Sequence, residues 1–132
     1  MDRPATTTLS EAPLVVAPDG SNVRVLLATG RGSMARFELA PGRASRAVRH
    51  GTVEEIWLVV EGHGEMWRRS GPDETVTPLE PGVCITLPVR TAFRFRSIGP
   101  ATLAIVAVTM PPWPGDAEAA AVDDGPRWPE DG

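Results

Sequence analysis

Short runs of apolar residues, each closed by glycine or proline, constrain the fold of this chain more than any other feature. Several runs alternate apolar and polar residues and are rich in valine, isoleucine, threonine and aromatic residues, which favours β-strands. Helical periodicity is absent before residues 116–122, and there are no heptads or internal repeats. The sequence therefore predicts an all-β sandwich or barrel. The predicted strands cover residues 23–29, 34–39, 54–60, 65–69, 75–79, 83–87, 92–96 and 102–108.

A length of 132 residues allows one domain with one hydrophobic core. We divide the chain into an N-terminal arm (1–19), a β-barrel (20–110) and an extended acidic C-terminal tail (111–132). The arm carries a net charge of −2 and the tail −5, which leaves +3 for the barrel. The tail contains Trp113 and Trp128, and tryptophan in such a segment is typical of docking onto the chain's own barrel or onto a partner subunit.

Missing residue types exclude several kinds of chemistry. All 13 basic residues are arginines and tyrosine is absent, so Schiff-base catalysis, a lysine base and a tyrosine acid are excluded. Only His50 and His63 supply imidazole, and the single Cys84 allows neither an internal disulfide nor a thiolate cluster. The barrel's charge is too weak for nucleic-acid binding. With no membrane-spanning run and no recognisable signal peptide, we expect a cytoplasmic protein.

Two stretches resemble the paired motifs of the cupin superfamily. Residues 41–64, PGRASRAVRHGTVEEIWLVVEGHG, resemble the first motif, and residues 81–97, PGVCITLPVRTAFRFRS, resemble the second. Together, TVEEIW, GEMW, FRFRS and TMPPWPGD are similar to a subgroup of small single-domain bacterial cupins, over residues 20–128. The resemblance implies a double-sheet jelly-roll β-barrel with a short Pro- and Trp-rich tail, whose interior can hold a ligand or a metal. Since small cupins commonly pair, it also implies a homodimer.

The resemblance further implies a metal site, but this sequence retains only two of the family's four ligands. The family's ligands are two histidines and a glutamate of the first motif and a histidine of the second. His50 and Glu55 match, whereas Val48 takes the first histidine position and Phe93, or Ala92 in the neighbouring register, takes that of the second motif. Valine and phenylalanine offer no lone pair, so a metal would need water or a replacement ligand. We expect either no cofactor or a weakly bound divalent metal.

Candidate ligand-binding residues surround this pair. Trp57 shares a strand face with Glu55, and Phe95 shares one with Phe93, which predicts an apolar lining. Arg49 and Arg94 each adjoin a ligand position, so we select them as contacts for an anionic group. Core packing and a solvated surface are the structural alternatives for the aromatic residues and the arginines. The predicted ligand-binding residues are Val48, Arg49, Trp57, Phe93, Arg94 and Phe95.

Three functions fit these residues, and the fold alone does not choose among them. The first is a barrel that binds a small apolar or anionic organic molecule, with His50 and Glu55 as catalytic residues of a metal-independent isomerase, cyclase or lyase. The second is a metal-dependent oxygenase or isomerase with a degenerate site, which uses the same pair, water and Cys84. The third is a non-catalytic small-molecule-binding or sensory domain. Having two protein ligands instead of four argues against the second.

Overall fold

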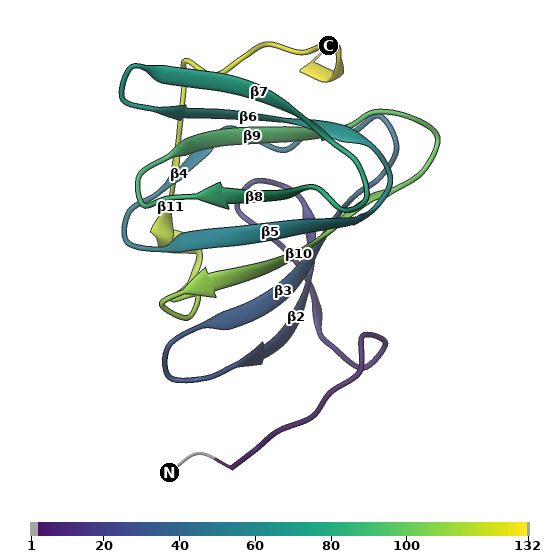
Figure 1. Cartoon of the computed structure of the whole chain (residues 1–132), viewed down its shortest axis with the longest axis vertical. Coiled ribbons are helices and arrows are strands. Elements are labelled where there is room, and N and C mark those ends of the chain that lie inside the picture. The colour runs from purple at the N-terminus through teal and green to yellow at the C-terminus, as the bar shows by residue number, and fades with distance from the viewer. Residues whose placement is uncertain (1–2, 132) are drawn as a thin grey trace.

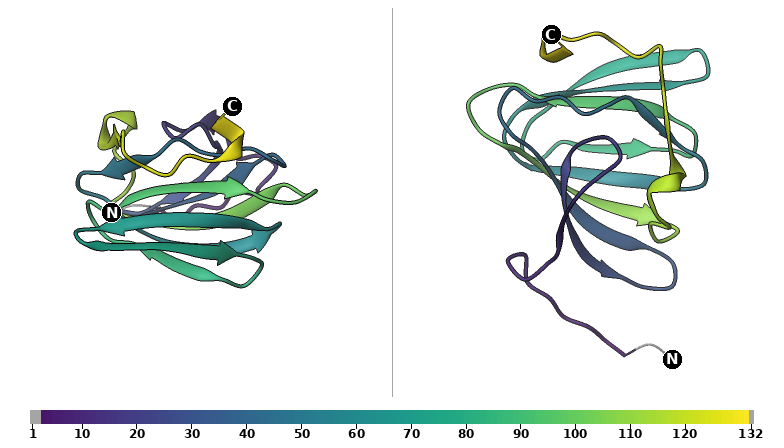
Figure 2. Two further views of the ribbon diagram at one scale, coloured as in Figure 1. Left: turned by 90° about the horizontal axis from the view of Figure 1, so that it is seen from above. Right: turned by 180° about the vertical axis from the view of Figure 1, so that it is seen from behind.

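The computed structural model describes residues 3–131 and consists mainly of strands. These form two antiparallel sheets that face each other (Figures 1 and 2). The elements are β1 (Leu14–Val16), β2 (Asn22–Ala28), β3 (Ser33–Leu39), β4 (Val48–His50), β5 (Glu54–Glu61), β6 (Gly64–Ser70), β7 (Asp73–Leu79), β8 (Cys84–Leu87), β9 (Ala92–Ser97), β10 (Leu103–Met110), the 3-10 turn η1 (Asp116–Glu118), β11 (Ala119–Ala121) and the 3-10 turn η2 (Pro129–Asp131). One sheet has the order β1–β2–β3–β10–β5–β8, and the other β11–β4–β9–β6–β7.

The all-β prediction is confirmed, and the eight expected strands lie close to their predicted ranges. Three short strands were not predicted. β1 lies in the expected N-terminal arm, β4 carries the first motif, and β11 lies in the expected tail. The helical periodicity of residues 116–122 yields only η1, because Ala119–Ala121 pairs instead with the open edge of β4. Pairing with a sheet edge outweighs the helix propensity of a short alanine run.

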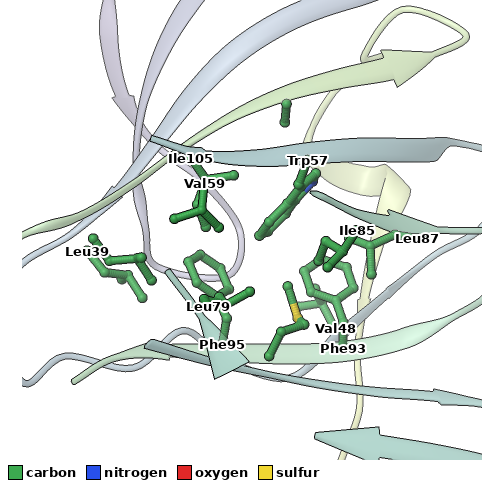
Figure 3. Packing of buried hydrophobic residues seen from close by; sticks show 13 residues of the cluster. Leu39, Val48, Trp57, Val59, Leu79, Ile85, Leu87, Phe93, Phe95 and Ile105 are labelled. Atoms are coloured by element: carbon green, nitrogen blue, oxygen red, sulfur yellow. The ribbon is translucent and has the colours of Figure 1, made fainter. Parts of the chain in front are cut away.

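The core lies between the two sheets and is built by alternate residues of their strands (Figure 3). Trp57 and Val59 face inward from β5, while Phe93 and Phe95 face inward from β9. All four side chains are at most 1% exposed. Because successive strand residues point to opposite faces, this packing also fixes the side on which Glu55 lies.

The turn between β5 and β6 packs closely against the start of β10. Gly62 has a φ of 78°, and a Cβ at this position would meet the Leu103 Cα at 2.8 Å. A larger residue is therefore excluded both by conformation and by space. His63 lies exposed at the tip of this hairpin, away from the core.

The C-terminal segment runs along the chain's own barrel, from the end of β10 past β11 toward β6 and β7 (Figure 1; Figure 2, right). Trp113 contacts His50, and Trp128 lies over the guanidinium of Arg94 at 4.8 Å. Asp131 forms an ion pair with the same arginine. Of the two docking alternatives for these tryptophans, the structure shows contact with their own barrel. No helix among residues 3–131 is long and apolar enough to span a membrane.

Candidate functional site

A buried histidine–glutamate pair lies where β4 ends and β5 begins. Nδ1 of His50 lies 2.9 Å from Oε2 of Glu55. The two residues are only 8% and 2% exposed. The other carboxylate oxygen, Oε1, accepts a hydrogen bond of 3.0 Å from Nε1 of Trp57. Since a buried carboxylate is unfavourable without partners, the imidazole and the indole together stabilise it in the interior.

Aromatic rings surround the imidazole of His50. The ring of Phe93 meets it edge-on with centroids 5.2 Å apart, and the ring of Trp113 meets it at 5.0 Å. Phe93 also contacts Trp57, at 5.7 Å. These contacts hold His50 between the second motif and the segment that follows β10.

The loop between the two members of the pair is held by Glu118 of η1. Its Oε1 accepts hydrogen bonds from the hydroxyl of Thr52 at 2.8 Å and from the backbone N–H groups of Thr52 and Val53. The backbone N–H of Thr52 contributes most to lowering the pKa of Glu118. Ala119 pairs with His50 across β11 and β4. The C-terminal segment thus fixes both ends of the connection that positions His50 and Glu55.

A cavity of about 250 Å³ opens beside this pair, on the inner side of β2 and β3. Most of its wall is apolar, and it includes Val25 and Leu27 of β2, which are only partly covered by the rest of the chain. The polar lining residues are Asp19, Ser33, His50, Glu55, Thr109 and Asp116. The large apolar and aromatic ones include Val25, Leu27, Phe37, Val48, Trp57, Phe93 and Trp113.

Asp19 is a lining residue that the sequence analysis missed. It is 6% exposed, and its Oδ1 accepts hydrogen bonds from the backbone N–H of Ser21 at 2.9 Å and from the Ser21 hydroxyl at 2.6 Å. Burial raises the pKa of Asp19, while the hydrogen bonds from Ser21 lower it to a smaller degree. The Pro18-Asp19-Gly20 sequence indicates only a turn at the end of the N-terminal arm. Its proximity to the pair follows from how β1 and β2 pair at the sheet edge.

The structure brings together five of the predicted site residues. Val48, Trp57 and Phe93 line the cavity together with His50 and Glu55. The β4–β9 pairing sets Val48 opposite Phe93 and Arg49 opposite Ala92. Phe93, and not Ala92, is therefore the second-motif residue on the cavity side.

Three other predicted ligand-binding residues lie elsewhere. Phe95 is fully buried and packs on Trp57 in the core, with centroids 5.1 Å apart. Arg49 is exposed, and its Nε donates to the carbonyl of Arg90 at 3.1 Å. Arg94 lies on the outer face of its sheet, where its Nε donates to the Ser45 carbonyl at 2.7 Å. Strand alternation explains both arginines, since a residue next to an inward-facing position faces outward.

The donors at this site do not fit a resident metal of the cupin type. Among residues 3–131, no three histidine, cysteine, aspartate or glutamate side chains lie close enough together to hold an ion. Val48 and Phe93 occupy the positions where the family resemblance implies histidines. Cys84 is exposed on β8 and does not line the cavity, so it does not replace them.

A model of the Cupin domain matches residues 35–109, which is more than half of the chain. The protein therefore belongs to the cupin family, as the two sequence motifs implied. No curated protein matches it.

Several solved structures share its fold. A uridine-bound structure of Pac13 from Streptomyces has a TM-score of 0.73 at 15% identity, over 92% of each chain. Pac13 is described as a nucleoside dehydratase. KdgF from Halomonas sp. has a TM-score of 0.68 at 16% identity, over 81% of this chain and 94% of KdgF. At these identities, the likeness establishes the cupin fold alone.

Proposed function

We propose that the protein binds a small organic molecule in the cavity, and that His50 and Glu55 act on it as an acid–base pair without a metal. The observation that carries this proposal is a cavity of about 250 Å³ with the buried pair in its wall. An apolar cavity of ~150 Å³ accommodates benzene. The cavity in this protein therefore has room for a substituted ring.

The geometry of the pair suits proton transfer. Glu55 lies at Nδ1 of His50, and no described residue forms a hydrogen bond with Nε2. Nε2 is thus available to accept or donate a proton, while the carboxylate stabilises the protonated ring. Isomerisation, cyclisation and elimination each require such a transfer. The dehydration described for Pac13 is an elimination, which supports lyase-type chemistry on this fold.

A non-catalytic binding or sensory domain would use the same cavity without chemistry. The two functions differ in the role of His50. An enzyme would show a pH-dependent rate that His50→Ala abolishes while binding persists, whereas a sensor would show binding alone.

Binding is tested by saturation-transfer NMR with two neutral probes, uridine and benzyl alcohol. We expect at least one to receive magnetisation from the wild-type protein. Val25→Trp fills the cavity from β2 and should abolish the signal, whereas Val76→Trp adds the same ring to an exposed position on β7 and should not. If Val25→Trp binds as well as the wild type, or if the wild type binds neither these probes nor a charged probe of the same size, the cavity is not the binding site.

Homodimer formation and a cytoplasmic location stay predictions from the sequence and its family resemblance. Light scattering coupled to size-exclusion chromatography tests the first, because it measures mass independently of shape. Fractionation of the native host tests the second.

A further inference from the structure

We infer that the ligand of this cavity carries a positively charged nitrogen, an ammonium or alkylammonium group, bound beside Asp19 and Glu55. The inference rests on the proposed function and names the class of ligand. It replaces the anionic ligand expected from Arg49 and Arg94, neither of which lines the cavity.

The charges that line the cavity are of one sign. Asp19, Glu55 and Asp116 contribute carboxyl groups, and no arginine in the described part of the chain lines the cavity. Lysine is absent from the sequence, so among residues 3–131 His50 is the one lining group that can become cationic. Charge interactions are strengthened where water is displaced by protein. An anionic ligand would therefore be repelled, whereas a cation would be attracted.

Glu55 has bonding capacity that the protein does not use. Its Oε2 is fully buried, lies 2.9 Å from Nδ1 of His50 and accepts no hydrogen bond from any residue that the structure describes. The residue is 2% exposed and lines the cavity. A buried carboxylate is unfavourable unless positive charge lies nearby, so an ammonium group bound in the cavity beside Glu55 would offset its charge.

Asp19 presents a second carboxyl group to the same space. Ser21 donates both of its hydrogen bonds to Oδ1, and no described residue donates to Oδ2. Burial raises the pKa of Asp19, and the negative charge of Glu55 raises it further. A bound cation would offset both effects and favour the ionised carboxylate.

The remaining walls suit an organic cation. Phe37, Trp57, Phe93 and Trp113 line the cavity around the two carboxyl groups. Aromatic rings attract alkylammonium ions through their quadrupoles and also bury the alkyl groups that such ions carry. A hydrated inorganic cation would gain little from these apolar walls. The combination of carboxylates and rings therefore favours an amine attached to an apolar or cyclic body.

The experiment compares three probes of nearly equal shape: benzylamine, benzyl alcohol and benzoate. They are cationic, neutral and anionic at pH 7, and their dissociation constants are measured by NMR titration at one ionic strength. We expect benzylamine to bind at least ~10-fold more tightly than benzoate, and more tightly than benzyl alcohol. Asp19→Asn keeps the acceptor for Ser21 and removes the charge. This variant should bind benzylamine with a dissociation constant close to that of benzyl alcohol. Glu55→Gln is a second variant with the same expected result.

Asp73→Asn, at the exposed start of β7, is the matched control for the change in net charge and should leave the amine-to-alcohol ratio unchanged. Benzoate binding as tightly as benzylamine would overturn the inference. So would an amine-to-alcohol ratio that neither Asp19→Asn nor Glu55→Gln lowers. In both cases the proposed function survives, because at least one probe still binds in the cavity. If no probe binds, the inference and the proposed function fail together.

Discussion

The indole of Trp57 is the hydrogen-bond donor that holds one oxygen of the buried Glu55 carboxylate. Trp57→Phe removes this donor and keeps much of the ring packing against Phe37 and Phe93. Two losses of stability follow. A buried charged acceptor left unpaired costs about 1–3 kcal/mol. The smaller ring at a position that is 1% exposed costs about 1 kcal/mol more.

We therefore expect Trp57→Phe to lower the free energy of unfolding by about 2–4 kcal/mol. For 132 residues, an unfolding entropy of ~2.1 cal/mol/K per residue gives about 0.28 kcal/mol per degree, so the Tm should fall by about 7–14 °C. Urea denaturation followed by far-UV circular dichroism measures the change, because tryptophan fluorescence is itself altered by the substitution.

A double-mutant cycle with Glu55→Met separates the hydrogen bond from the packing. Methionine has a volume similar to that of glutamate but no hydrogen-bond-accepting carboxylate. In the Glu55→Met background, Trp57→Phe should therefore lower the free energy of unfolding only by the packing contribution. The expected coupling energy is about 1–3 kcal/mol. A coupling below ~0.5 kcal/mol would refute the view that the indole holds the carboxylate.

Three further predictions concern the metal, the buried acid and the tail. Val48→His combined with Phe93→His adds two imidazoles beside the buried pair and should raise bound metal, measured by mass spectrometry, to about one ion per chain; a double variant that stays metal-free would contradict the alignment of β4 with β9. The pKa of Asp19 is raised in the folded state, so its contribution to stability is full below pH ~4 and is lost as the pH rises through the folded-state pKa. Asp19→Asn should therefore raise the Tm relative to wild type at pH 7 and lose this advantage at low pH; an advantage independent of pH would argue against a buried charge. Trp128→Ala removes the ring above Arg94 and should speed amide hydrogen exchange in the C-terminal segment, at a cost of ~0.5–1 kcal/mol; unchanged exchange would mean that other contacts hold the segment.

Much of the fold could be predicted from local patterns. Alternation along residues 54–60 placed Glu55 and Trp57 on one face, and the structure shows both buried while the neighbouring Glu54 is exposed. Strand alternation requires only the two-residue repeat of the backbone, so it is visible in a single sequence. The same rule predicts that Arg94 faces outward, because it is next to the inward-facing Phe93. Arg94 was instead selected as a ligand contact because it adjoins Phe93 in the sequence.

Local patterns along the chain were enough to predict the strands, the cupin motifs and the candidate pair His50 and Glu55. That Asp19 and Trp113 reach this pair is visible only in the folded protein, because they come from segments far away in the chain. It also decided that Ala119–Ala121 forms a strand, since β4 offers an open edge. Side-chain alternation is a local property of each strand, whereas the composition and charge of a cavity depend on which distant segments the closed barrel brings together.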